Sequence, residues 1–432
     1  MSYSATNRVI NPDGEELTIS AKPFNIPKRA VWEAWKQIKA NGGGAGIDEI
    51  TIEQYESSLV KNLYKLWNRM SSGSYFPSAV KRVDIPKLDG SLRPLGIPTI
   101  EDRIAQMVAK QLLEPELEKV FHPDSYGYRP GKSAIDAVRR ARQRCWDRIW
   151  VVDLDIKGFF DNINHELLLK ALDKHNNHRW VRLYVQRWLT APVQHRDGQL
   201  EERTQGTPQG GVISPLLANL FLHYALDAWM VRTHRDIPFE RYADDAVYHC
   251  RNPREADRLL AALKARLTTC GLEAHPEKTR KVYCKNSNRK DSHPVTHFDF
   301  LGFRFGPRKA RNRQGQIFTA FSPSMSPKAF KRIKDKVRQW RVINWVDRSL
   351  SEMAKVLNPA IQGWLNYYGH FGRRYGVYRL QKYLDQTLMR WARKKFKHLK
   401  RSCFKSWVFI GKVRQQMRGL FAHWRMGRLQ MC

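Results

Sequence analysis

Two adjacent carboxylates lie in the middle of a stretch rich in aromatic and β-branched residues. Residues 239–248 form two short runs with strand character around a polar tip, and Asp244 and Asp245 occupy that tip. Neighbouring carboxylates repel each other unless a cation lies between them, and their oxygen atoms are ligands that suit Mg²⁺. The alternative is a solvated turn without a ligand, so the rest of the sequence has to decide between the two.

A third carboxylate favours the cation site. Asp155 follows the short apolar run 150–154 and precedes a glycine turn. If the fold places the end of this strand beside the polar tip, the three acids can hold two Mg²⁺ ions about 3.5–4 Å apart, the arrangement used for nucleotidyl transfer. Asp153 would share a strand face with Asp155, and we rank it below Asp155. The separate roles of Asp153 and Asp245 stay open at this point.

The charge of the chain predicts a polyanionic partner. Its 432 residues include 76 Lys and Arg against 41 Asp and Glu, a net charge of +35. Residues 301–432 carry 31 of the basic residues and only four acids, and aromatic residues are interleaved with them. This combination is typical of a nucleic-acid surface, with a solubility or membrane-surface role as the alternative. The candidate catalytic acids lie in the nearly balanced remainder.

The sequence gives no sign of a zinc site, a disulfide framework or a membrane segment. The six cysteines form no CxxC pair, which fits a reducing compartment. The most apolar run, residues 212–230, is interrupted by Asn219, His223 and Asp227, so it predicts a buried helix and not a membrane span. We therefore expect a cytoplasmic protein without a membrane partner.

The two carboxylate stretches resemble the palm motifs of reverse transcriptases, and most closely those of group II intron-encoded reverse transcriptase/maturases. The similarity runs from about Trp32 to the C-terminus, and residues 357–368 resemble the maturase signature of that family. No His/Cys endonuclease pattern follows, so the chain is similar to the compact subclass without an endonuclease domain. The resemblance implies a bacterial cytoplasm or nucleoid as its location.

The resemblance also implies the fold. It is an α+β right-hand polymerase, with fingers and palm built on antiparallel sheet, then an α-helical thumb and a short basic C-terminal region. The expected divisions are 1–75 for an N-terminal extension and the start of the fingers, 76–306 for fingers and palm, 307–392 for the thumb or maturase domain, and 393–432 for a basic DNA-binding region.

The resemblance assigns nucleotide-binding residues on two loops. Residues 83–95 predict a hairpin with an Asp-Gly turn, and Lys87 and Arg93 on either side of it could contact a triphosphate. Residues 205–215 resemble the family motif whose glutamine, here Gln209, borders the nucleotide and the template. Without the palm motifs, ordinary basic loop residues would be the preferred interpretation of the hairpin.

Two further residues and one strand pair follow from the same resemblance. Phe160 occupies the position of the bulky aromatic residue that excludes a ribose 2′-hydroxyl, whereas its neighbour Phe159 is expected in the core. Lys278 resembles a family lysine near the nucleotide phosphates. Residues 298–305 alternate aromatic residues at period two around Gly302, and the resemblance makes them the primer grip.

Beyond residue 307 the apolar spacing becomes helical. Helices are predicted to start after Ser326, after Ser349 with Glu352 completing a capping box, and near Val377, and together they would form a small bundle. The basic residues expected to contact nucleic acid are Lys331, Lys334, Arg338, Arg373, Arg374, Lys394 and Lys395.

The carboxylate pattern and the family resemblance together predict an RNA-directed DNA polymerase that uses dNTPs and two Mg²⁺ ions. Its expected partners are an RNA template–DNA primer duplex, target DNA and its own group II intron RNA, which it would help to splice and to retrohome by target-primed reverse transcription. One alternative is a splicing-only maturase without polymerase activity, and the intact set of three acids argues against it. The other is an RNA-dependent RNA polymerase, and Phe160 argues against that.

Overall fold

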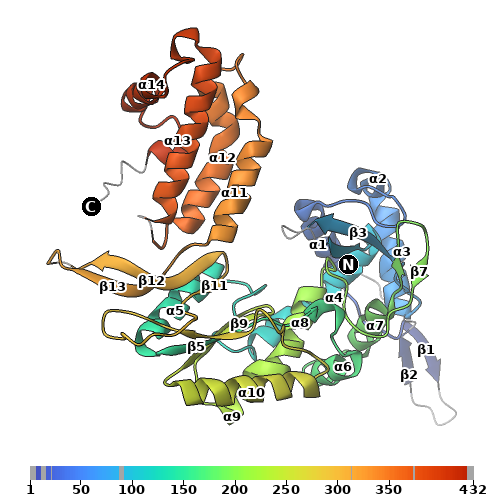
Figure 1. Ribbon diagram of the computed structural model, residues 1–432. Coiled ribbons are helices and arrows are strands. Elements are labelled where there is room, and N and C mark those ends of the chain that lie inside the picture. The colour runs from blue at the N-terminus through green and yellow to red at the C-terminus, as the bar shows by residue number, and fades with distance from the viewer. Residues whose placement is uncertain are drawn as a thin grey trace.

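The computed structural model describes residues 6–10, 16–20, 22–86, 92–312, 314–372 and 375–425. The chain runs from an N-terminal helical part through a central sheet to a C-terminal helical bundle. The bundle and the N-terminal part rise from opposite ends of the central sheet (Figure 1).

The N-terminal part contains a hairpin and a group of packed helices. No strand was expected in this part from the sequence, so the hairpin is an addition. Helix α1 buries Val31, Trp35 and Ile38, the apolar positions at helical spacing, and packs against α4. The elements are β1 (Thr6–Ile10), β2 (Glu16–Ser20), α1 (Lys28–Asn41), α2 (Ile52–Glu56), α3 (Leu59–Ser72) and α4 (Ile100–Glu118).

A small sheet connects this part to the centre. The predicted hairpin is present as β3 (Val80–Pro86) and β4 (Leu92–Ile97), which pair antiparallel, while its turn lies outside the described residues. The sheet order is β4-β3-β6-β7, with β6 (Val193–Gln194) parallel to β3 and β7 (Leu200–Glu201) at the edge. Helices α6 (His165–Asp173) and α7 (Arg179–Thr190) follow the central strand β5 and lead into β6.

The central sheet has the order β10-β5-β9-β8, with every pair antiparallel. Strand β5 lies between two neighbours, and its mostly buried residues fit a strand covered on both faces. Helix α10 packs on this sheet from one side and α5 from the other. The elements are α5 (Ala134–Asp147), β5 (Trp150–Leu154), β8 (Phe239–Tyr242), β9 (Asp245–Cys250), α10 (Pro253–Thr269) and β10 (Arg280–Tyr283).

The apolar run of residues 212–230 is helical and largely buried, as predicted. It is divided into α8 (Ser214–Leu222), a π-helical turn η2 (His223–Asp227) and α9 (Ala228–Thr233). The π-helical turn was not predicted. Among the described residues, none of the helices combines the length and the apolar character needed to cross a bilayer.

The C-terminal part begins with a three-stranded sheet and continues as helices. The strand pair around Gly302 is present, and β13 adds a third, unpredicted strand. The three predicted helices are present, the Ser349–Glu352 capping box is formed, and α14 is an addition. The elements are β11 (Phe298–Phe300), β12 (Phe303–Arg311), β13 (Ile317–Met325), α11 (Pro327–Gln339), η3 (Val342–Asn344), α12 (Leu350–Tyr368), α13 (Gly376–Lys395), η4 (Lys397–Leu399), α14 (Cys403–Gln416) and η5 (Ala422–Trp424).

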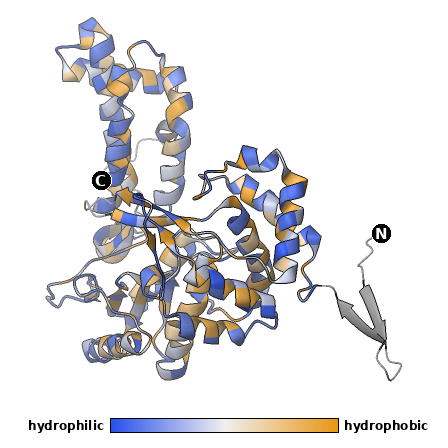
Figure 2. Ribbon diagram, turned by 90° about the vertical axis from the view of Figure 1, so that its right-hand side faces the viewer, coloured by the Kyte–Doolittle hydropathy of each residue, from blue (hydrophilic) through white to orange (hydrophobic). Residues whose placement is uncertain are grey.

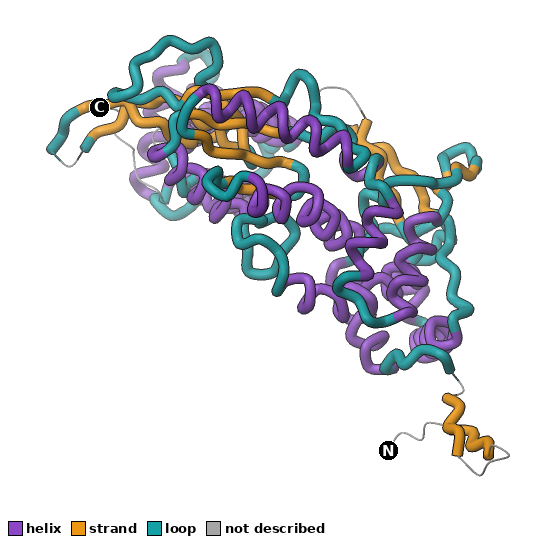
Figure 3. The backbone as a smooth tube through the Cα atoms, turned by 90° about the horizontal axis from the view of Figure 1, so that it is seen from below, coloured by secondary structure: helices purple, strands orange, loops and turns teal. Residues whose placement is uncertain are grey.

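The apolar core has three parts. The largest joins the N-terminal helices, α8 and one face of the central sheet. The second joins the other face of that sheet to α5 and to β11–β13. In Figure 3 a group of strands lies close together at the end of the molecule near the C-terminus. The third lies inside the C-terminal bundle, where each helix carries apolar and polar stripes (Figure 2). The bundle therefore has a core of its own.

Candidate active site

Strand register brings the three predicted acids together. Strands β5 and β9 are antiparallel neighbours, and the last pair of their ladder joins Leu154 to Ala246. The next residue along the chain, Asp155, therefore reaches the level of Asp245 at the start of β9. Asp244 precedes it in the tip of the β8–β9 hairpin. All three carboxylates line one cavity of about 420 Å³.

Burial and the charges of neighbouring acids oppose ionisation of Asp244 and Asp245. Burial, and then the charge of Asp155, raises the pKa of Asp244. The pKa of Asp245 is raised to about 7 by the surrounding protein and by the charges of Asp244 and Asp155. Asp153 also has its pKa raised to about 7, mainly by burial, although Arg280 lies 3.4 Å away. The cluster thus carries an excess of negative charge that a cation would neutralise.

The donor set fits a hard divalent cation, because it consists of carboxylate oxygens in a polar cavity. In the described parts of the chain, no three acidic, histidine or cysteine side chains stand at the mutual spacing of metal ligands. Lys278 instead places its Nζ 3.3 Å from both carboxylate oxygens of Asp155. The residue expected near nucleotide phosphates therefore neutralises one of the acids.

Two predicted nucleotide residues meet in the same cavity. Arg93 on β4 donates its Nε–H to Oε1 of Gln209 at 2.7 Å, and both side chains line the cavity. The Gln209 carbonyl accepts from the Gly96 amide at 2.8 Å. Gly210 has φ +126°, and a Cβ there would lie 2.5 Å from the Gly96 carbonyl oxygen, so the close docking of this loop needs glycine. Lys87 lies outside the described residues.

Phe160 forms part of the cavity wall. It lies in the 3₁₀ turn η1 (Phe159–Asp161), and only 7% of its surface is exposed. Its ring meets Phe159 edge to face at 5.3 Å, and Phe159 in turn packs near Phe221 in the core. The Phe160 carbonyl accepts from the amide of Thr207 at 2.7 Å. The aromatic side chain is thus held firmly at the edge of the cavity.

Tyr128 lines the cavity and was not singled out from the sequence. Its backbone has φ +58°, a left-handed conformation that a tyrosine rarely adopts. Burial, and then the charge of Asp244, raises its pKa. The preceding Gly127 lies so close to the hairpin tip that a Cβ there would be 2.5 Å from the amide nitrogen of Ala243. The glycines of the stretch 125–133 were the sequence signal that could have pointed to this segment. The stretch contains no acid or histidine, so it offered no candidate catalytic side chain.

A second cavity of about 370 Å³ adjoins the first. Pro94, Asp161 and Gln209 line both cavities and form the wall between them. The second cavity presents both signs of charge, with Arg82 and Arg203 beside the acids Asp161, Glu201 and Glu202. It lies on the side of Gln209 away from the three predicted acids.

The basic residues expected to contact nucleic acid divide into two groups. Lys331 and Arg338 are exposed on α11, although Arg338 also pairs with Asp335 at 3.0 Å. Lys334, half-buried on the same helix, lies over the ring of Phe330. These side chains remain available at the surface.

The second group is engaged within the bundle. Lys394 donates to Oδ1 of Asn344 at 2.9 Å, and Lys395 donates to the carbonyl of Arg348 at 2.7 Å. Both lysines therefore brace α13 against the segment before α12. The remaining two predicted residues, Arg373 and Arg374, lie outside the described residues.

Residues 85–305, just over half of the chain, match the family described as reverse transcriptase (RNA-dependent DNA polymerase). Residues 330–409 match the maturase-specific domain of group II introns. The first range contains all three acids, and the second contains most of the C-terminal bundle.

The chain is also similar to individual proteins over part of its length. Protein YkfC of Escherichia coli is 38% identical over 185 residues, which are 41% of this chain and 48% of that protein. Group II intron-encoded protein LtrA of Lactococcus lactis is 33% identical over 193 residues, 44% of this chain and 32% of that protein. The matched parts span about half of the first relative and about a third of the second. A solved structure of apo telomerase from Candida tropicalis gives a TM-score of 0.43 at 15% identity, over 56% of this chain and 59% of that one.

Proposed function

Because the chain belongs to the reverse transcriptase (RNA-dependent DNA polymerase) family and carries the maturase-specific domain of group II introns, we propose that it extends a DNA primer on an RNA template and binds its parent intron RNA. One observation carries the polymerase proposal. Asp155, Asp244 and Asp245 come from two strands to one cavity, where burial and mutual repulsion raise the pKa of two of them.

In this proposal the three acids hold magnesium. When bound, two Mg²⁺ ions lower the pKa of the attacking primer hydroxyl and stabilise the leaving pyrophosphate. The protein has to present the carboxylates in ionised form and to align the primer end with the dNTP. Since the pKa of Asp245 is about 7, protons compete with metal ions for this cluster near neutral pH.

The nucleotide would lie between the acids and the Arg93–Gln209 pair. Arg93, together with Lys87 on the same hairpin, would contact the triphosphate. Lys278 can exchange its bond to Asp155 for a phosphate oxygen. Phe160, fixed in the cavity wall, would collide with a ribose 2′-hydroxyl. In the second cavity, which shares Gln209 as a wall, Arg82 and Arg203 would contact the template strand beside the acids Glu201 and Glu202.

The arms around the cavity would hold the nucleic acids. We assign residues 76–306 to fingers and palm, residues 1–75 to an extension of the fingers, residues 307–392 to the thumb and residues 393–432 to target-DNA contacts. The charge distribution supports this assignment, because the last 132 residues hold 31 Lys and Arg and four acids. The same surface would bind intron RNA for splicing and for retrohoming by target-primed reverse transcription.

Splicing assistance alone is the second candidate, and the maturase-domain match favours it. Two assays on the purified chain separate the candidates. One is extension of a DNA primer on an RNA template with dNTPs and Mg²⁺, and the other is splicing of its intron RNA. We expect activity in both assays. Splicing without extension would refute the polymerase proposal and support the second candidate.

A further inference from the structure

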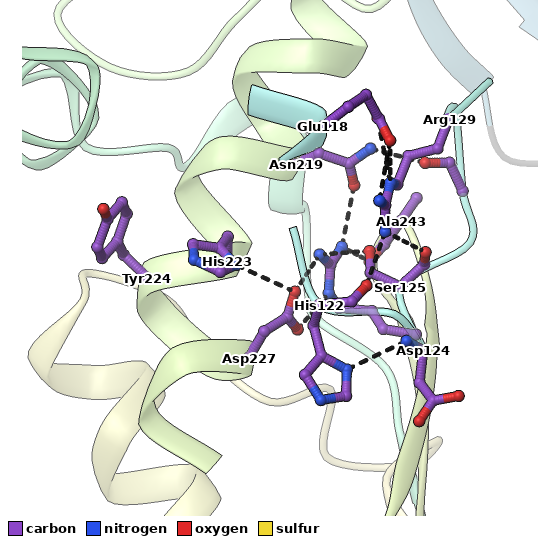
Figure 4. A network of polar contacts seen from close by, with 12 residues as sticks. Glu118, His122, Asp124, Ser125, Arg129, Asn219, His223, Tyr224, Asp227 and Ala243 are labelled. Atoms are coloured by element: carbon purple, nitrogen blue, oxygen red, sulfur yellow. Dashed lines mark hydrogen bonds and ion pairs between the residues drawn. The ribbon is translucent and has the colours of Figure 1, made fainter. Parts of the chain in front are cut away.

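We propose that the buried ion pair between Asp227 and Arg241 is a positioning device for the catalytic turn. It fixes the backbone at Ala243 and thereby the direction in which Asp244 and Asp245 leave the hairpin. Figure 4 shows Asp227, Asn219, Ser125 and Ala243 in this network, which come from separate segments of the chain. The inference rests on the proposed polymerase function, whose acids it positions.

The pair is fully buried and fully engaged. Arg241 on β8 and Asp227 in η2 have no exposed surface. The Nε–H of Arg241 donates to Oδ1 of Asp227 at 2.7 Å, and its Nη2–H donates to Oδ2 at 2.6 Å. This two-pronged arrangement fixes the plane of the guanidinium as well as its position. An arginine held in this way cannot rotate without breaking its two bonds to Asp227.

The remaining donors of the guanidinium reach the turn and its neighbours. Nη1–H donates to the carbonyl of Ala243 at 3.1 Å and to Oδ1 of Asn219 at 3.0 Å. Ala243 has φ +55°, a conformation that alanine adopts only when the surroundings hold it. Its carbonyl belongs to the peptide that begins Asp244. The bond from Arg241 therefore stabilises the strained residue directly before the acids.

Asn219 extends the same arrangement to the segment that carries Tyr128. Its Nδ2–H donates to the carbonyl of Gly127 at 2.6 Å, and Arg241 also donates to Oγ of Ser125 at 2.8 Å. One guanidinium thus joins both chain segments that border the cavity beside Asp244. The π-helical turn places Asp227 against it, and such turns are frequent at functional sites.

A second buried ion pair on the same strand provides a contrast. Glu240 has no exposed surface and accepts from Arg144 at 2.6 Å, and His249 Nε2 lies 2.6 Å from its other oxygen. Neighbouring residues of a strand point to opposite faces, so this pair lies on the face away from Arg241. None of its described contacts reaches the turn of residues 243–245. It stabilises the hairpin without holding its tip.

The test compares Arg241→Lys with Glu240→Gln in the full chain. Lysine keeps the charge opposite Asp227 but cannot donate to Asp227 and Ala243 in the same plane. We expect kcat for primer extension to fall about ten- to a hundredfold, as for a small misplacement of reacting groups, with little change in KM for dNTP. The Mg²⁺ concentration for half-maximal rate should rise. Glu240→Gln should lower thermal stability and leave the Mg²⁺ dependence unchanged.

An Arg241→Lys enzyme with wild-type kcat and Mg²⁺ dependence would overturn the proposal, as would an equal kinetic effect of Glu240→Gln. If the lysine variant does not fold, the double variant Asp227→Leu/Arg241→Met serves in its place, because replacing both members of a buried pair by apolar residues often preserves stability.

Binding of Mn²⁺, followed by electron paramagnetic resonance without nucleic acid, gives a readout independent of polymerisation. Whichever of the two variants folds should bind Mn²⁺ about tenfold more weakly than the wild type, and unchanged binding would contradict the proposal. A wild-type protein without extension activity would refute the proposed function, while the Mn²⁺ measurement would still decide this inference.

Discussion

At the scale of single residues, the site is a cluster of carboxylates whose negative charge the surrounding side chains neutralise only in part. Asp245 lines the cavity beside two other carboxylates, and among the described residues Lys278 and Arg93 compensate part of their charge. Burial further disfavours ionisation, so the folded chain without metal holds protons that a free aspartate would have lost. The acids are therefore arranged for a ligand and not for stability.

This charge predicts a pH effect on stability. The pKa of Asp245 rises from its ordinary value of 3.8 to about 7 in the fold, so between these values the folded chain binds more protons than the unfolded one. Without metal, the stability should therefore decrease as the pH rises through this window. Asp245→Asn should weaken the decrease, and Mg²⁺ should offset it in the wild type. Thermal unfolding from pH 5 to pH 8 measures both, and equal slopes for variant and wild type would contradict the account.

Phe160 predicts a change in sugar selection. Phe160→Ala removes the ring from the cavity wall and should raise rNTP incorporation relative to dNTP by about ten- to a hundredfold, since a steric clash against the hydroxyl is lost. Phe160→Tyr keeps the bulk and serves as the control. Competition between labelled rNTP and dNTP in single-nucleotide extension measures the ratio. An unchanged ratio in the alanine variant would remove the proposed gate.

At the scale of elements, the site depends on how strands pair and how loops dock. The alternating strands were predictable because their apolar residues recur at period two, and the three bundle helices because theirs recur at helical spacing. The pairing of β5 with β9 was an assumption of the sequence argument, and the ladder shows it. Strand β13 was missed because Ser322, Pro323 and Ser324 interrupt its apolar run. Helix α14 was missed because lysine and arginine are mixed with its apolar residues.

Other features had no local signal at all. Asp227 and Arg241 lie in different elements, so no spacing rule connects them. The three polar residues of the run 212–230 argue against a membrane span, and two of them, Asn219 and Asp227, also bind Arg241. The left-handed backbone of Tyr128 is likewise a product of tertiary packing. Each buried polar residue in an apolar helix needs a hydrogen-bond partner, and that partner can lie at the functional site.

The close packing of two segments predicts the effect of one methyl group. In Gly127→Ala the new Cβ would lie 2.5 Å from the Ala243 nitrogen, so backbone has to shift at the tip that carries the acids. We expect a loss of stability of about 1–3 kcal/mol and a lower kcat for extension. Gly363→Ala is the matched control, because a Cβ there meets nothing within 4 Å. Urea unfolding and primer extension measure the two effects, and a Gly127 variant that behaves like its control would contradict the packing argument.

At the scale of the whole molecule, a cavity lined by acids lies within a strongly cationic chain. The net charge of +35 draws nucleic acid to the protein, while the acids act only at the point of chemistry. The C-terminal bundle has its own core and carries much of the positive charge. Lys394 and Lys395 bond to the segment before α12, whereas Arg338 pairs within its own helix, so the two groups of basic residues should differ in their effect on binding.

Salt titration tests this difference. Binding of an RNA–DNA duplex should weaken by about 10³- to 10⁵-fold between 50 and 200 mM salt if 6–10 phosphates are contacted. Lys331→Ala/Arg338→Ala should lower the slope of log Kd against log salt by about two. Lys394→Ala/Lys395→Ala should change the slope less and reduce stability instead, because these lysines brace α13. The reverse ranking of the two double variants would show that the wrong surface had been assigned.

The most direct measurement replaces one acid and follows two activities on the same preparation. With Asp244→Ala we predict that extension of a DNA primer on an RNA template is abolished at every Mg²⁺ concentration. Binding of intron RNA should stay within about twofold of wild type, because the positive surface lies elsewhere. Extension that persists in this variant would contradict the claim that Asp155, Asp244 and Asp245 form the catalytic centre.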